Sequence, residues 1–203
     1  MAYSDFTLDA IRKSFGITLK RDCLFPAVAP VEVPPWLTAL LEKGMPLAFV
    51  SEKSRAEFII VPVLLASRDL AHASFTIYSG QRLDSDLSRG LSGECDFILS
   101  LTPPLPVLQA PIVVIVEAKK NDIEAGLGQC AAQMVGARLF NQHEGNSLET
   151  IFGCVTTGED WQFLKLEHDT VVIDGGRYYI DRVDTILGIL QAILATYTSL
   201  TTA

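Results

Sequence analysis

The sequence feature that most constrains the fold is the run IVVIV at residues 112–116, which is followed directly by Glu117, Ala118, Lys119 and Lys120. Valine and isoleucine are branched at Cβ and favour strands. A strand whose apolar residues are continuous, rather than alternating with polar ones, is typical of a sheet that is covered on both faces. The run therefore predicts a buried central strand with helices on either side of it.

The rest of the sequence predicts helices, strands, one helix, further strands and a closing helix, in that order, which favours an α/β domain with a central mixed sheet. The predicted helices cover residues 4–17, 34–44, 51–70, 122–143 and 183–200. The predicted strands cover residues 73–80, 94–101, 111–120, 150–158, 161–168, 170–173 and 177–180.

Capping, proline and glycine residues predict where several of these elements begin, bend or end. Ser4 or Asp5 is the expected N-cap of helix 4–17, and Ser51 is the expected N-cap of helix 51–70. Pro62 is expected to kink helix 51–70. Gly44 is expected to end helix 34–44, and residues 174–176 (Asp-Gly-Gly) are expected to form a hairpin between the last two strands. The chain of 203 residues is expected to form one domain. Within it, residues 1–49 form a helical and proline-rich extension, and residues 50–195 form the core.

Composition narrows the possible partners and compartment. The net charge of −8 argues against binding nucleic acid by bulk electrostatics, although it leaves room for a local basic groove. The cysteines form no C-x-x-C pair, so we expect free buried thiols rather than a zinc site or a disulfide framework: Cys23, Cys95, Cys130 and Cys154. No secretory signal and no apolar stretch of membrane length is seen, which predicts a cytoplasmic protein without a membrane partner.

The charged end of the buried strand suggests chemistry. Because side chains alternate along a strand, Glu117 and Lys119 share one face. Asp96 lies inside the apolar stretch ECDFIL, where an unpaired charge is costly. If the two strands are neighbours, Asp96 and Glu117 converge and repel each other, and a hard dication such as Mg²⁺ relieves that repulsion. Lys119 is then placed to hold or deprotonate a metal-bound water, which suits attack on a phosphate. The alternative is that the strand simply ends in solvent.

Asp96 on one strand, followed by Glu117-Ala118-Lys119 at the end of the next, resembles the PD-(D/E)XK or restriction-endonuclease-like nuclease superfamily. The resemblance covers roughly residues 50–195. In that superfamily a helix before the strands usually supplies a further acid, and Glu52 occupies that place, with Glu57 as the second choice. The helix after the motif often carries glutamine, and here it carries Gln129 and Gln133.

The resemblance implies a restriction-endonuclease-like core and a metal-dependent endonuclease that hydrolyses DNA phosphodiester bonds. It implies that Asp96, Glu117 and Glu52 bind Mg²⁺ or Mn²⁺, that Lys119 positions the attacking water, and that Gln129 supports the site. It also implies DNA as the partner and a possible homodimer. An alternative from another class is a catalytically inactive copy of this fold that serves as a binding or assembly module, which the acidic composition favours.

Overall fold

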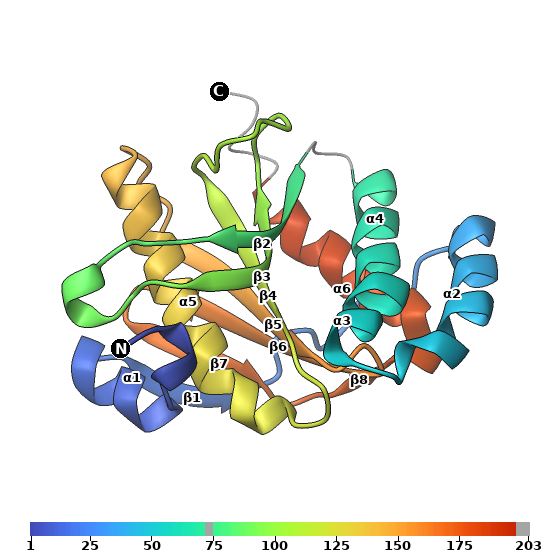
Figure 1. Cartoon of the computed structure of the whole chain (residues 1–203), viewed down its shortest axis with the longest axis horizontal. Coiled ribbons are helices and arrows are strands. Elements are labelled where there is room, and N and C mark those ends of the chain that lie inside the picture. The colour runs from blue at the N-terminus through green and yellow to red at the C-terminus, as the bar shows by residue number, and fades with distance from the viewer. Residues whose placement is uncertain (72–74, 198–203) are drawn as a thin grey trace.

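The structure is a computed structural model that describes residues 1–71 and 75–197. It contains an eight-stranded mixed sheet with helices on both faces (Figure 1). The strand order is β1-β7-β6-β5-β4-β3-β2, and β8 pairs separately with β6. Most neighbouring strands are antiparallel, whereas β1–β7 and β4–β5 are parallel. The strands are β1 (Thr18–Asp22), β2 (Thr76–Arg82), β3 (Glu94–Ser100), β4 (Ile112–Ala118), β5 (Thr150–Thr156), β6 (Asp160–Glu167), β7 (Thr170–Asp174) and β8 (Tyr178–Tyr179).

Two groups of helices enclose the sheet. One face is covered by α1 and α5, which share an apolar cluster with it, and the other face is covered by α4 and α6, with α2 packed on the outer side of residues 52–70 (Figure 1). The α-helices are α1 (Leu8–Phe15), α2 (Pro35–Ala48), α3 (Glu52–Arg55), α4 (Val61–Leu70), α5 (Ile123–His143) and α6 (Val183–Ala195). The prediction of an α/β fold with a mixed central sheet flanked by helices is thereby confirmed.

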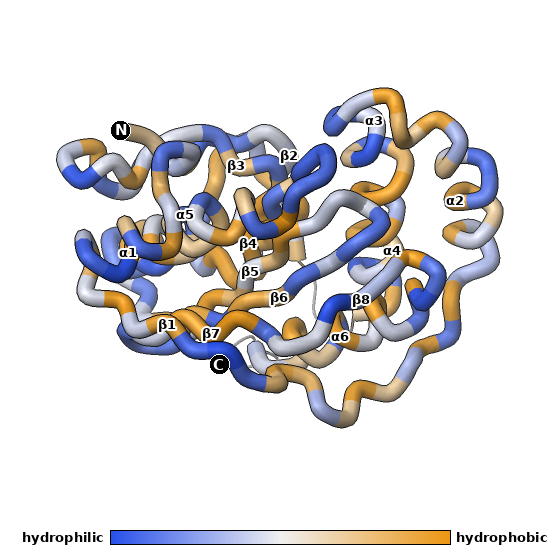
Figure 2. Tube along the Cα trace, turned by 90° about the horizontal axis from the view of Figure 1, so that it is seen from below, coloured by the Kyte–Doolittle hydropathy of each residue, from blue (hydrophilic) through white to orange (hydrophobic). Residues whose placement is uncertain are grey.

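Strand β4 lies deep in the molecule, as its apolar run predicts. All seven of its residues are buried, including Glu117. Its neighbours are β3 on one side and β5 on the other, so its backbone groups are paired at both edges. Figure 2 shows the same arrangement by hydropathy, with hydrophobic residues concentrated in the central strands. The carboxylate at the end of β4 is therefore not in free solvent.

The helical segment before β2 begins as predicted and then departs from α-helical geometry. Ser51 caps α3, because its Oγ accepts a hydrogen bond from the N–H of Ser54 at 3.0 Å. A π-helical turn, Ala56–Ile60, then joins α3 to α4, and the N–H of Val61 reaches back to the carbonyl of Ala56. Proline has no N–H and its ring crowds the preceding turn. The wider π turn directly before Pro62 accommodates that crowding.

Four local predictions are wrong. Helix α2 continues past Gly44 to Ala48, and Gly44 is a packing position rather than a helix end, since an added Cβ would lie 2.9 Å from the Phe58 carbonyl oxygen. Thr7, rather than Ser4 or Asp5, caps the first α-helix. Strands β7 and β8 do not pair with each other, since both pair with β6. Of the cysteines, Cys23 is exposed, while the other three are buried and free as expected.

Strand β1 was not predicted, because its residues are mostly exposed and lack an alternating pattern. The strand pairs in parallel with β7, so residues 18–22 belong to the sheet and are not only an extension of it. Two predicted elements fall partly outside the described residues. These are the start of strand 73–80 and the end of helix 183–200.

Candidate active site

Glu117, at the end of β4, has both carboxylate oxygens in hydrogen bonds. Its Oε1 accepts a hydrogen bond from Lys119 Nζ at 2.7 Å, and its Oε2 accepts one from Gln133 Nε2 at 2.8 Å. Glu117 is 1% exposed. Gln133 reaches Glu117 from α5, which packs against β4. Lys119 reaches it from two residues further along the chain. From the sequence, Gln133 was expected on this helix, but no partner for it was predicted.

Lys119 joins β4 to the start of α5. Its Nζ donates a second hydrogen bond to Gln129 Oε1 at 3.0 Å. Its aliphatic chain lies against Gly126, where an added Cβ would stand 3.1 Å from Lys119 Cγ and 2.6 Å from Val155 Cγ1. Only a residue without a side chain fits between them. Gly126 therefore permits the close packing that brings the lysine to Glu117.

Asp96 lies on β3, the strand next to β4, as predicted. The antiparallel ladder pairs Phe97 with Val116. One step further along, Asp96 Oδ2 accepts a hydrogen bond from the backbone N–H of Ala118 at 2.7 Å. One carboxylate oxygen is thus committed to the backbone beside Glu117. The side chain also reaches a pocket of about 380 Å³.

This pocket brings the helix-borne acid to the strands. Glu52, from α3, lines it together with Asp96. Glu57 instead points toward Lys53 on the helix surface, at 4.0 Å, and does not line the pocket. The structure thus favours Glu52 over Glu57 as the helix-borne acid. A third acid, Glu94, also lines the pocket, and the sequence analysis did not single it out.

Burial and mutual proximity shift the pKa values of Glu117, Asp96 and Lys119. Burial, reinforced by the Asp96 carboxylate and opposed by Lys119 and Gln133, raises the pKa of Glu117 to about 7. Burial likewise raises the pKa of Asp96, although the hydrogen bond from Ala118 opposes that shift. Burial alone lowers the pKa of Lys119, but the adjacent Glu117 carboxylate outweighs it and the net shift is upward. A carboxyl group with a pKa near neutrality is common at functional sites.

The predicted metal ligands do not form a ready-made cluster. Within residues 1–71 and 75–197, no group of three or more histidine, cysteine, aspartate or glutamate side chains is arranged to hold one ion. The residues with suitable oxygen donors are Asp96 and Glu52 at the pocket, and Glu117 behind them. Mg²⁺ takes one or two carboxylates and keeps several waters, so the donor chemistry fits such an ion. For Glu117 to bind such an ion, its Oε1 must give up the hydrogen bond from Lys119 Nζ.

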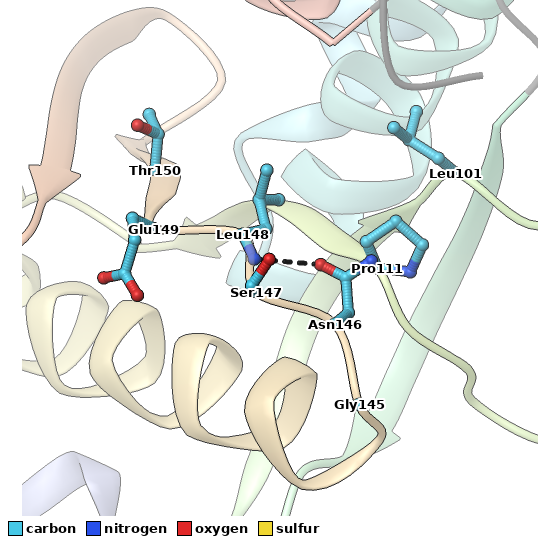
Figure 3. A pocket seen from close by; sticks show the side chains of 8 residues that line it. All are labelled: Leu101, Pro111, Gly145, Asn146, Ser147, Leu148, Glu149 and Thr150. Atoms are coloured by element: carbon cyan, nitrogen blue, oxygen red, sulfur yellow. Dashed lines mark hydrogen bonds between the residues drawn. The ribbon is translucent and has the colours of Figure 1, made fainter. Parts of the chain in front are cut away.

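A second pocket, of about 620 Å³, lies at the other end of the sheet. Figure 3 shows its lining by Leu101, Pro111 and the segment 145–150. Pro111 directly precedes β4 and Thr150 begins β5, whereas Glu117 and Lys119 lie at the opposite end of β4. This pocket therefore has no part in the site around Glu117.

The protein is thus an α/β protein in which two neighbouring strands of a mixed sheet bring two carboxylates and a lysine together beneath a helix that carries a further acid. No family model and no solved structure matches the chain. Among curated proteins it is similar to Crinkler effector protein 1 of Rhizophagus irregularis, with 23% identity over 186 residues. That similarity covers 83% of this chain, and the chain spans 38% of the length of the relative. None of the described helices has the length and apolar character needed to cross a membrane.

Proposed function

We propose that this chain is a metal-dependent nuclease that hydrolyses DNA phosphodiester bonds on a restriction-endonuclease-like core. The observation that carries the proposal is the convergence of Asp96, Glu117 and Lys119 at one end of β3 and β4. A carboxylate pair with a lysine beside it suits phosphate chemistry, because the carboxylates can hold a cation and the ammonium can stabilise developing negative charge. Glu52, across the pocket, adds a third carboxylate.

The residues take distinct roles in this proposal. Asp96 and Glu117 bind Mg²⁺ or Mn²⁺, and Glu52 binds the ion or orients one of its waters. A bound ion of this kind supplies charge neutralisation and a more acidic water. Lys119 positions the attacking water and donates to the phosphate. Gln129, which already accepts from Lys119 Nζ, holds the ammonium when Glu117 is engaged elsewhere. The partner is DNA, and a homodimer would allow both strands of a duplex to be cut.

The test is a plasmid-nicking assay with Mg²⁺ or Mn²⁺ on the purified protein. We expect nicking by the wild type and its loss in Asp96→Asn, Glu117→Gln and Lys119→Ala. We expect Glu52→Gln to lower the rate by at least tenfold. Glu57→Gln is the matched control, because Glu57 lies on the same helical segment but outside the pocket, and it should nick at the wild-type rate. Equal nicking by the wild type and all the site variants would refute the proposal.

A second candidate is a catalytically inactive protein of the same fold that serves as a binding or assembly module. It is favoured by the internal hydrogen bonds that already occupy both oxygens of Glu117, and by the net charge of −8. Absence of nicking by folded wild-type protein at pH 6 to 9, with either metal, would favour this candidate. Sedimentation with labelled duplex in Ca²⁺ would then show whether DNA is bound without being cut.

A further inference from the structure

The turn between β5 and β6, residues 156–160, is cross-linked by its own hydrogen bonds. Thr156 Oγ1 donates to the carbonyl of Asp160 at 2.8 Å and accepts from the N–H of Gly158 at 2.8 Å. Thr157 Oγ1 accepts from the N–H of Asp160 at 3.1 Å. The indole of Trp161, which is fully buried, donates to the carbonyl of Gly158 at 2.9 Å. A turn with this many internal bonds is a rigid platform.

This platform holds the backbone of the lysine in the candidate active site. Strands β4 and β5 run parallel, with Ala118 beside Thr156, so the turn lies at the same end of the sheet as Glu117. The ladder continues one residue further, because the N–H of Lys119 donates to the carbonyl of Thr156 at 2.8 Å. The position of Lys119 is therefore tied to the turn as well as to its own strand.

Arg55 connects α3, the helix that carries Glu52, to the same turn. Its Nη1 donates to the carbonyl of Thr157 at 3.0 Å and to Glu159 Oε2 at 2.9 Å. Its side chain is 9% exposed, and the guanidinium lies over the ring of Phe49, 4.8 Å from the centroid. Its Nε is buried and has no hydrogen-bond partner among the described residues. A buried guanidinium is costly, and here the bonds that offset the cost all lead to one turn.

Arg55 is also the last residue of α3, and Glu52 is the first. Residues three apart on a helix lie on neighbouring positions of one side. Helix α3 is the first turn of a helical segment that continues through Ala56–Ile60 into α4, and the end of a helix frays unless side chains anchor it. Ser51 caps this turn locally. Arg55 supplies its long-range hydrogen bonds, across about a hundred residues of sequence.

We propose that Arg55 is a positioning residue that fixes Glu52 over the pocket by anchoring α3 to the β5–β6 turn. The turn then positions both α3 and Lys119, since it also binds the backbone of Lys119. This inference rests on the proposed function of Glu52 in metal binding and adds a residue that the PD-(D/E)XK pattern does not assign. Arg55 acts through Glu52 and touches neither the metal nor the substrate.

The test uses Arg55→Lys, which keeps the charge but is one bond shorter and lacks the planar guanidinium that lies over Phe49 and places Nη1 between its two acceptors. Hydrogen exchange without metal should speed up for amides 52–60 and remain unchanged elsewhere. Calorimetry should show Mn²⁺ binding weakened by about tenfold, the scale seen when a residue that supports a metal ligand is lost. Glu159→Gln, whose side chain is 44% exposed, should shift both measurements in the same direction by less.

A double-mutant cycle separates positioning from general destabilisation. If Arg55 acts through Glu52, the losses of Mn²⁺ affinity in Glu52→Gln and Arg55→Lys are not additive, and the double variant binds as weakly as the weaker single variant. Arg12→Met removes an arginine from an exposed ion pair with Asp9 on α1 and should change neither exchange at 52–60 nor Mn²⁺ affinity.

The outcomes distinguish this inference from the proposed function. Additive losses, or unchanged exchange at 52–60 in Arg55→Lys, would overturn the role of Arg55 while leaving the nuclease proposal in place, provided that the wild type binds Mn²⁺ and nicks DNA. Wild-type protein that neither binds Mn²⁺ nor nicks DNA would overturn both. Non-additive losses with local exchange confined to 52–60 would support Arg55 as the positioning residue.

Discussion

Replacing Glu117 by glutamine tests the unusual environment of this carboxyl group without any metal or substrate. The pKa of Glu117 is raised to about 7 in the folded protein from an ordinary value of 4.5. Between these two values the folded state keeps a proton that the unfolded state has released. The folded state therefore binds more protons, and stability falls as the pH rises through this window. Below about pH 4.5 the full contribution is present, and above about pH 7 it is lost.

The size of the effect follows from the width of the window. Each pKa unit corresponds to about 1.4 kcal/mol, so the difference between 4.5 and about 7 corresponds to roughly 3 to 4 kcal/mol in the free energy of unfolding. Glutamine does not titrate, which removes this term from the variant. The free energy of unfolding of wild type minus that of Glu117→Gln should therefore fall by roughly 3 to 4 kcal/mol between pH 4.5 and 7, and stay level on either side.

Urea titrations at half-unit steps from pH 4 to 8.5, in chelator, measure this difference. The fluorescence of Trp161, which is fully buried, reports the unfolding. Glu42→Gln, at an exposed position on α2, is the control for the substitution itself. A pH-independent difference for Glu117→Gln would mean that the carboxyl group is not held in a costly environment, and the reasoning about its burial would be refuted.

Three further substitutions test the surroundings of the site. Lys119→Ala removes the ammonium group beside Glu117, so calorimetry should show unchanged or higher Mn²⁺ affinity, while nicking falls by about 10²-fold. Nicking at the wild-type rate would refute the role assigned to Lys119. Gly126→Ala should lower the free energy of unfolding by about 1–3 kcal/mol, because its Cβ meets Val155 at 2.6 Å; an unchanged melting temperature would contradict this. Asn141→Ala, which strips both backbone hydrogen bonds from Ile112, should cost about 2 kcal/mol or more in urea titrations, and a loss below about 0.5 kcal/mol would contradict it.

The central part of the fold was predictable from sequence because its signal is local and strong. The apolar run of β4 indicates a strand covered on both faces, and that strand is wholly buried. The run also identifies the end at which Glu117 and Lys119 emerge. By contrast, β1 has the burial pattern of a solvated edge, and nothing in its five residues distinguishes it from a loop. Its pairing with β7 depends on tertiary packing that no local pattern encodes.

The residues of the candidate site could be named from the sequence, but their hydrogen-bond partners could not. The spacing of Gln129 and Gln133 places both on one side of α5. Which of them meets Lys119 and which meets Glu117 depends on how α5 packs on β4. The anchoring role of Arg55 had no sequence signal, because its partners lie about a hundred residues away. The bond from Ala118 to Asp96 depends on strand register, which the sequence leaves open.

The parallel pairing of β1 with β7 has a consequence for how the chain reaches this structure. Thr18 lies beside Thr170, so among the described strands β1 pairs with one that follows it by about 150 residues of sequence. Contacts of such large sequence separation slow folding, because a long loop must close before they form. During synthesis β1 must wait as an unpaired segment, and its exposed Lys20 and Arg21 suit that interval, since charged edge strands resist pairing with other chains. Removing residues 1–22 would leave β7 as a new open edge, and we expect a protein truncated in this way to aggregate.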